Sequence, residues 1–186
     1  IQNHADLAVC PLTERDFLVT KEQHKLRDII IKNGYNAEFI DENLKPDYPC
    51  DVLLNCVIIG KHIFYNPKTV SSKIRNFVKE NDLIEVTVRP GYTKCSIAPV
   101  SVDAFITDDI SIGSRGAEFG FDVLVINKGD IKLKKFDYGF IGGATGKISE
   151  DKLAVNGNIK LHKSCDEIIN FAKKHLVEII SLNNGY

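Results

Sequence analysis

The stretch AFITDDISIGSRGAEFGFDVLVI, residues 104–126, decides the fold because it reads as strand, helix and strand in quick succession. The apolar run 104–107 predicts a buried strand, residues 110–118 predict a short helix, and the run 122–126 predicts another buried strand. A shorter apolar segment at 96–98 precedes them and predicts one more strand. The complete unit is therefore strand, strand, helix, strand, and we call it a module.

The module recurs four times along the 186 residues. Its landmarks Asp6, Asp51, Cys95 and Gly139 are 45, 44 and 44 residues apart. A fixed period of this length indicates stacked or circular units. In the other three copies we predict strands at 6–10, 17–20, 37–40, 51–54, 62–65, 84–88, 139–141, 152–155 and 177–181, and helices near 21–33, 69–80 and 164–174.

The content of the module restricts the architecture. Solenoid repeats are usually shorter or all-helical, and four-stranded propeller blades contain no helix. The unit matches instead a five-module, pseudo-symmetric α/β-propeller, with strands around the axis and helices outside. We predict one such α/β domain over residues 1–186, with modules at about 1–47, 48–92, 93–137 and 138–186. Since five modules need more than four copies, we expect the remaining strands before Ile1 and after Tyr186.

Four segments carry a family resemblance: Asn3–Asp6, Gly91–Ser96, Tyr138–Gly146 and Leu153–Gly157. With the repeats, they make the chain resemble the guanidino-group-modifying (pentein) superfamily, and within it an uncharacterised bacterial branch. The resemblance implies chemistry at one end of the axis. A cysteine thiolate attacks a guanidinium or amidine carbon, a histidine moves protons, and carboxylates hold the cationic substrate.

The chain departs from the enzyme pattern at three places. Tyr92 stands where the resemblance puts a catalytic histidine, Ile141 replaces the acid before Gly142-Gly143, and no cysteine is seen in the last module near Tyr186. We therefore interpret the chain as a pentein-fold protein that binds a small ligand or a partner without the standard catalytic motifs. The alternative is a cysteine-dependent hydrolase or amidinotransferase acting on a guanidino or amidine metabolite.

Candidate site residues lie where modules begin. Cys95 is the candidate nucleophile, with Lys94 beside it to lower its pKa, although a cysteine at a strand start is often only a buried apolar residue. The glycine-rich segment 139–146 indicates close backbone packing or a ligand contact, and Asn156-Gly157 indicates a tight hairpin turn. His162 either faces the axis or caps the helix near Ser164. We expect the ligand site to gather His4, Asp6, Asn55, Lys94, Cys95, Gly143 and Asn156.

Composition excludes several functions. A formal net charge of −1 argues against a polyanion binder, and the basic stretch Lys132–Lys135 is typical of a solvated edge or turn. No apolar run is long enough to span a membrane. The five cysteines form no Cys-x-x-Cys pair, which predicts reduced thiols, a cytoplasmic protein and no metal site. We expect no cofactor and no nucleic acid, a small-molecule ligand as partner, and leave a homo-oligomer open.

Overall fold

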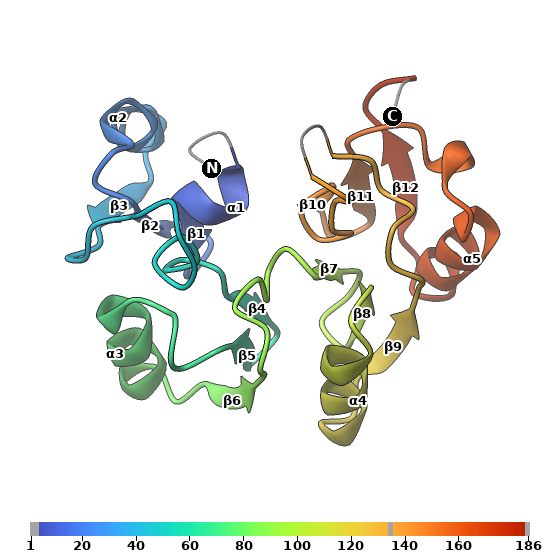
Figure 1. The fold of residues 1–186 in the computed structure, drawn as a ribbon, viewed down its shortest axis with the longest axis horizontal. Coiled ribbons are helices and arrows are strands. Elements are labelled where there is room, and N and C mark those ends of the chain that lie inside the picture. The colour runs from blue at the N-terminus through green and yellow to red at the C-terminus, as the bar shows by residue number, and fades with distance from the viewer. Residues whose placement is uncertain (1–3, 134–135, 185–186) are drawn as a thin grey trace. The chain divides into compact units, whose positions relative to one another are not determined.

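The computed structural model describes residues 4–133 and 136–184. Its contacts divide the chain into two compact units, Ile1–Thr93 and Lys94–Tyr186, each of which contains two modules (Figure 1). The single domain predicted over 1–186 stays a prediction. The predicted basic stretch Lys132–Lys135 and the expected strands beyond the chain ends lie partly or wholly outside the described residues.

The first unit contains two three-stranded sheets, ordered β1-β2-β3 and β4-β5-β6. Its elements are α1 (Ala5–Ala8), β1 (Val9–Pro11), β2 (Asp16–Val19), α2 (His24–Lys32), β3 (Asn36–Phe39), β4 (Val57–Ile59), β5 (His62–Tyr65), α3 (Ser72–Glu80) and β6 (Ile84–Thr87).

The second unit repeats this arrangement with the sheets β7-β8-β9 and β10-β11-β12. Its elements are β7 (Ile97–Pro99), β8 (Ala104–Thr107), α4 (Ile110–Glu118), β9 (Asp122–Val125), β10 (Thr145–Ser149), β11 (Lys152–Val155), the 3₁₀ helix η1 (Ile159–Leu161), α5 (Cys165–Lys174) and β12 (Glu178–Ser181).

All four modules share one topology. The first strand pairs antiparallel with the second, and the second pairs parallel with the third after a helical crossover, as β7, β8 and β9 do. The registers make the last residues of the middle strands equivalent, so Val19, Tyr65, Thr107 and Val155 occupy the same place. This equivalence lets residues of one module be compared with those of another.

The middle strands carry the core because they are flanked on both sides. In the first unit the buried cluster includes Ile63 of β5 and Ile74 of α3, both 0% exposed. In the second unit it includes Ile106 of β8 and Leu153 of β11, again 0% exposed. Burial of one such side chain stabilises the fold by roughly 1.5–3 kcal/mol. The buried middle strands therefore position the loops that follow them.

The structure confirms the mixed α/β character and corrects three predicted strands. Residues 5–8 are helical, whereas 51–54 and 139–141 form turns and irregular backbone. Most of their apolar side chains are buried, but their amides bond locally, as Leu7 N–H does to the carbonyl of His4 and Val52 N–H to that of Pro49. The first strands begin later, at Val9, Val57 and Thr145.

The four sheets of the described residues are separate, and none of them closes on itself. A complete five-module ring therefore stays a prediction. None of the helices in the described ranges has both the length and the apolar character that crossing a membrane demands.

Candidate functional site

The predicted site residues are divided between the two units. They lie mainly in the segments before each first strand, at 4–8, 51–55, 93–96 and 141–144, which we call the pre-strand turns. The first unit holds His4, Asp6 and Asn55, and the second unit holds the other four residues. Convergence of all seven at one axis stays a prediction.

In the first unit two of the predicted residues meet. Asn55 is fully buried, and its Nδ2 donates to the backbone carbonyl of Asp6 at 3.0 Å. His4 is the N-cap residue of α1 and makes no side-chain cap bond. Asp6 does not lie in the strand predicted at 6–10, because residues 5–8 are helical and do not alternate between two faces as strand residues do.

A buried carboxylate in the second pre-strand turn was not predicted as a site residue. Asp51 is 1% exposed, and its Oδ2 accepts a hydrogen bond from the hydroxyl of Tyr92. Its Oδ1 is buried and has no hydrogen-bond partner among the described residues. The ring of Tyr48 stacks on that of Tyr92, with centroids 6.2 Å apart. Gly91 allows this arrangement, since a Cβ there would lie 2.6 Å from the Tyr48 ring.

This acidic and aromatic cluster has the chemistry to hold a planar cation. A buried carboxylate oxygen without a partner is unfavourable, because it has lost its hydration without gaining a hydrogen bond. A guanidinium or amidinium group would supply both the donor and the opposite charge. Aromatic rings attract such cations through their faces, and Tyr48 is 55% exposed and so accessible.

In the second unit the third and fourth pre-strand turns pack on each other. Lys94 Nζ donates to the carbonyl of Gly142 at 2.8 Å, and the Gly143 amide donates to the carbonyl of Cys95 at 3.0 Å. A Cβ on Gly142 would overlap the carbonyl oxygens of Lys94 and Ile97. Close backbone packing therefore explains Gly142. Cys95 is 5% exposed.

Asp108, which follows β8, is a second buried carboxylate missed by the sequence analysis. It is 3% exposed, its Oδ2 accepts from the Ile141 amide at 3.2 Å, and its Oδ1 has no described partner. Burial raises the pKa of Asp108 to about 6, although the Ile141 bond opposes this shift. The module register could have revealed it, because the equivalent positions are all polar, namely Thr20, Asn66 and Asn156.

Asn156 and His162 take local roles. The predicted hairpin at Asn156-Gly157 is not formed, because β11 leads through a bend into η1. Asn156 is exposed and its Oδ1 accepts from Asn183 at 3.0 Å. His162 Nδ1 accepts from the Ser164 amide at 3.0 Å, which supports the capping alternative. Both line a cavity of about 70 Å³, and burial lowers the pKa of His162.

No group of three or more His, Cys, Asp and Glu side chains in the described parts of the chain is arranged to hold a metal ion. In the first unit the candidate site residues are Asp51 and the Tyr48–Tyr92 pair. In the second unit they are Asp108 and the Lys94–Cys95 turn, which lies against the glycine-rich segment.

Comparisons with known proteins bear on the family and the fold. A family model, described as a family of unknown function (DUF6873), matches residues 1–186. No curated protein matches the sequence significantly.

Several solved pentein-type structures are similar to the chain. One is a dimethylarginine dimethylaminohydrolase adduct, at 8% identity and a TM-score of 0.60, covering 97% of this chain and 70% of that one. Another is an agmatine deiminase from C. jejuni, at 10% identity and a TM-score of 0.59, covering 90% of this chain and 60% of that one. A third is an amidinotransferase of saxitoxin biosynthesis from Microseira wollei, at 11% identity and a TM-score of 0.56, covering 94% of this chain and 61% of that one. At such identities the likeness concerns the fold alone, and the chain spans about two thirds of these proteins.

Proposed function

Because the chain belongs to DUF6873, a family of unknown function, we propose a function from its fold and site: it binds a small guanidino or amidine metabolite and acts on it as a cysteine-dependent hydrolase or amidinotransferase. The similar structures are named as a dimethylaminohydrolase, a deiminase and an amidinotransferase, which supports this class of substrate.

The buried carboxylate of Asp51 is the observation that carries the proposal. One of its oxygens is held by Tyr92, and the other has no partner in the described chain. A guanidinium offers planar N–H donors and a positive charge, which are the two things this oxygen lacks. Tyr48 would cover the cation with its exposed ring. In this proposal Tyr92 orients the binding carboxylate.

Cys95 is the proposed nucleophile. Its thiolate attacks the guanidinium carbon and forms a carbon–sulfur bond, while an amine or ammonia leaves with a proton. Water then breaks the carbon–sulfur bond in a hydrolase, or a second amine does so in an amidinotransferase, and the thiol is regenerated. Lys94, which directly precedes Cys95, is the nearest cation in the sequence, and a cation close to the sulfur would favour the thiolate. Convergence of the remaining predicted residues, His4 among them, on the same ligand is part of the proposal.

The proposal is tested by binding and turnover of matched compounds. L-arginine and L-citrulline have the same shape, but only arginine carries a guanidinium, so we expect calorimetry to detect arginine preferentially. Asp51→Asn keeps an acceptor for Tyr92 and removes the charge, so it should weaken arginine binding at least about tenfold. The matched control is Asp47→Asn, at an exposed position, which should leave affinity unchanged. Equal binding of arginine and citrulline would contradict the proposal.

A second candidate function is ligand binding without catalysis, and the burial of Cys95 favours it. At 5% exposure the sulfur is covered as a core residue would be. Mass spectrometry of a panel of guanidino compounds separates the candidates, since hydrolysis replaces an imino nitrogen by oxygen. Turnover that Cys95→Ala abolishes and Cys165→Ala retains supports the enzyme. Binding that survives Cys95→Ala with no product from any compound supports the silent binder.

A further inference from the structure

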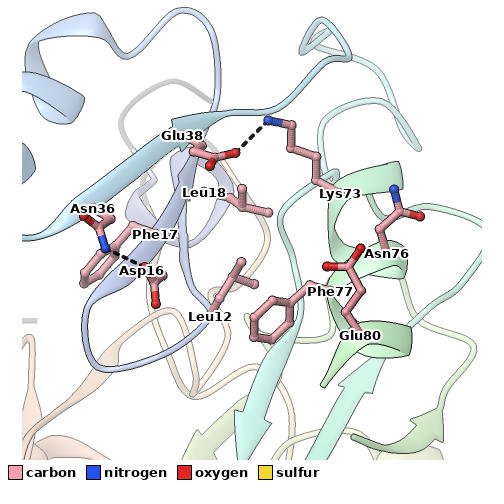
Figure 2. Close-up of a pocket in the computed structure, with 10 residues that line it drawn as sticks. All are labelled: Leu12, Asp16, Phe17, Leu18, Asn36, Glu38, Lys73, Asn76, Phe77 and Glu80. Carbon is pink, nitrogen blue, oxygen red and sulfur yellow. Dashed lines mark hydrogen bonds and ion pairs between the residues drawn. The ribbon is translucent and has the colours of Figure 1, made fainter. Parts of the chain in front are cut away.

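A cavity of about 360 Å³ lies between the first and second modules, within the first unit (Figure 2). Its walls come from the β1–β2 hairpin, β3 and helix α3, and none of the candidate site residues lines it. The volume is at the lower end of the roughly 300–1,000 Å³ typical of small-molecule sites. We call it the inter-module pocket. Its charged lining residues are Asp16, Glu38, Lys73 and Glu80, and its aromatic lining residues are Phe17 and Phe77.

The charges of the inter-module pocket do not balance. It is lined by three carboxylates and one ammonium group. Lys73 Nζ pairs with Glu38 at 2.9 Å, so that pair is neutral. Asp16 is ionised, because hydrogen bonds from Thr13 and Asn36 lower its pKa. Glu80 has no ion-pair partner in the described chain. The carboxylates of Asp16 and Glu80 therefore face the same cavity without an ion pair in the described parts of the chain, although the charge of Arg15 also acts on Asp16.

The second unit contains positions equivalent to those around the inter-module pocket, so the two units can be compared there. Asp122 begins β9 as Asn36 begins β3. Helices α3 and α5 each end two residues before a left-handed residue, Asp82 at φ 48° and Leu176 at φ 58°. Glu80 and Lys174, the last residues of these helices, are therefore equivalent.

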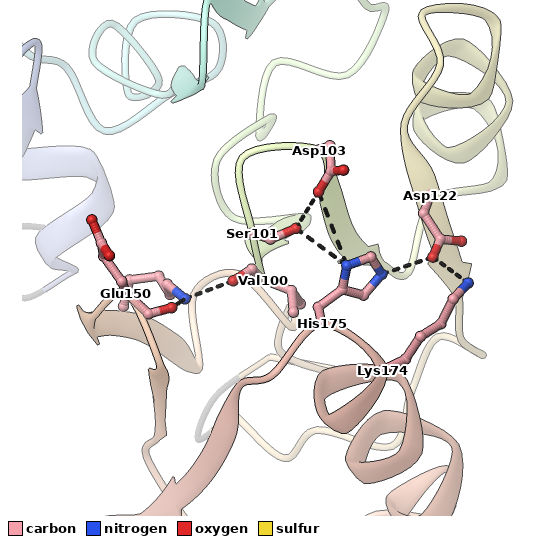
Figure 3. A network of polar contacts seen from close by, with 8 residues as sticks. Val100, Ser101, Asp103, Asp122, Glu150, Lys174 and His175 are labelled. Carbon is pink, nitrogen blue, oxygen red and sulfur yellow. Dashed lines mark hydrogen bonds and ion pairs between the residues drawn. The ribbon is translucent and has the colours of Figure 1, made fainter.

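At the equivalent place of the second unit, the carboxylate of Asp122 is paired with a lysine of the same chain and contacts a histidine ring. Lys174 Nζ and His175 Nε2 approach one oxygen of Asp122 at 2.5 and 2.7 Å (Figure 3). The hydroxyl oxygen of Ser101 lies 3.4 Å from Nδ1, the other ring nitrogen of His175. In the first unit the position of Lys174 is taken by Glu80, which reverses the charge and leaves a cavity.

We propose that the inter-module pocket binds a small aliphatic dication of the diamine class. Two positive charges match the two unbalanced carboxylates, Asp16 and Glu80. The methylene chain between them would lie against Phe17 and Phe77, whose faces also attract ammonium groups. This inference is independent of the guanidino site, since it uses none of the same residues.

Titration of the full chain with 1,4-diaminobutane tests the proposal, with 1,4-butanediol as the neutral control of the same length. At low salt we expect calorimetry to give a Kd below about 1 mM for the diamine and no binding of the diol. Raising the ionic strength to about 0.5 M should weaken binding of the diamine, because salt screens the partly exposed carboxylates. Equal affinity for both compounds, or no binding of either, would overturn the inference.

Three variants locate the site. Glu80→Lys introduces the residue type found at the equivalent position of α5, so the fold should tolerate it, and diamine affinity should fall at least about tenfold. Glu178→Lys makes the same charge change on exposed β12 and should have no effect.

The third variant, Lys73→Gln, frees the carboxylate of Glu38 and should tighten binding about threefold, which mere structural damage would not do. If Glu80→Lys and Glu178→Lys weaken diamine binding equally, or if Lys73→Gln weakens diamine binding, the inter-module pocket is not the binding site. Asp51→Asn should leave the diamine affinity unchanged, which separates failure here from failure of the guanidino proposal.

Discussion

Replacement of Asp108 by asparagine should stabilise the protein at neutral pH and do so less at acidic pH. Burial raises the pKa of Asp108 from the usual 3.8 to about 6. A carboxyl whose pKa is higher in the folded state favours folding when it is protonated, and this contribution is lost as the pH rises through about 6. The ionised carboxylate of Asp108 therefore destabilises the folded protein at pH 7.5.

The size of the effect follows from the two pKa values. Compared with strongly acidic pH, where Asp108 is protonated in both states, ionisation in both states lowers the unfolding free energy by about 3 kcal/mol. About 1 kcal/mol of this decrease has already occurred at pH 4.5, because the carboxyl of the unfolded chain is largely ionised at that pH. The amide introduced by Asp108→Asn does not titrate, so the stability difference between this variant and the natural chain should grow by about 2 kcal/mol between pH 4.5 and 7.5.

Urea denaturation of both proteins at the two pH values measures this difference. The Asn side chain keeps an acceptor for the Ile141 amide, and any unsatisfied amide group affects both pH values equally. Asp109→Asn is the control. Burial acts to raise the pKa of Asp109, but the bonds from Ser111 and Lys128 outweigh it and lower that pKa, so its contribution is present at both pH values. Asp109→Asn should destabilise by about 0.5–1 kcal/mol at each. A difference for Asp108→Asn that is constant with pH would refute the reasoning.

Two further predictions concern packing and thiols. Gly142→Ala should lower the unfolding free energy by about 1–3 kcal/mol, because the new methyl group meets the backbone of Lys94, whereas Gly146→Ala, with open space around it, should be nearly neutral; thermal melts compare them. All five thiols should be free in denatured protein, and in native protein Cys10 and Cys56, which are buried with sulfurs 3.4 Å apart, should alkylate more slowly than the half-buried Cys50 and Cys165. Rapid native alkylation of Cys56 would contradict this burial and the pKa that the Cys10 contact and burial raise.

The parts of the fold that the sequence predicts well are those with strong local signals. The middle strand Ala104–Thr107 and the helix Ile110–Glu118 agree with prediction because an unbroken apolar run and a capped amphipathic segment need no distant partner. Three of the four first strands were predicted too early in the chain, because the pre-strand turns are as apolar as strands, as residues 52–54 are. Their backbone bonds within the turn, which residue type alone does not reveal.

The site was harder to predict because its properties depend on distant contacts. In the sequence Asp51 begins a predicted strand and Asp108 follows another, and nothing local marks either residue as buried. The groups that hold them are Tyr92, 41 residues from Asp51, and Ile141, 33 residues from Asp108. Only the fold shows that both carboxylates are buried with one oxygen lacking a described partner. The module register, applied to residues that follow the middle strands, would have singled out Asp108.

Titration of L-arginine and L-citrulline into the natural chain and Asp51→Asn tests the central claim most directly. If Asp51 receives a guanidinium, arginine binds and citrulline does not, and the arginine affinity falls at least about tenfold in the variant while Asp47→Asn retains it. Affinity for arginine that is unchanged by Asp51→Asn would contradict the claim that this carboxylate holds the ligand.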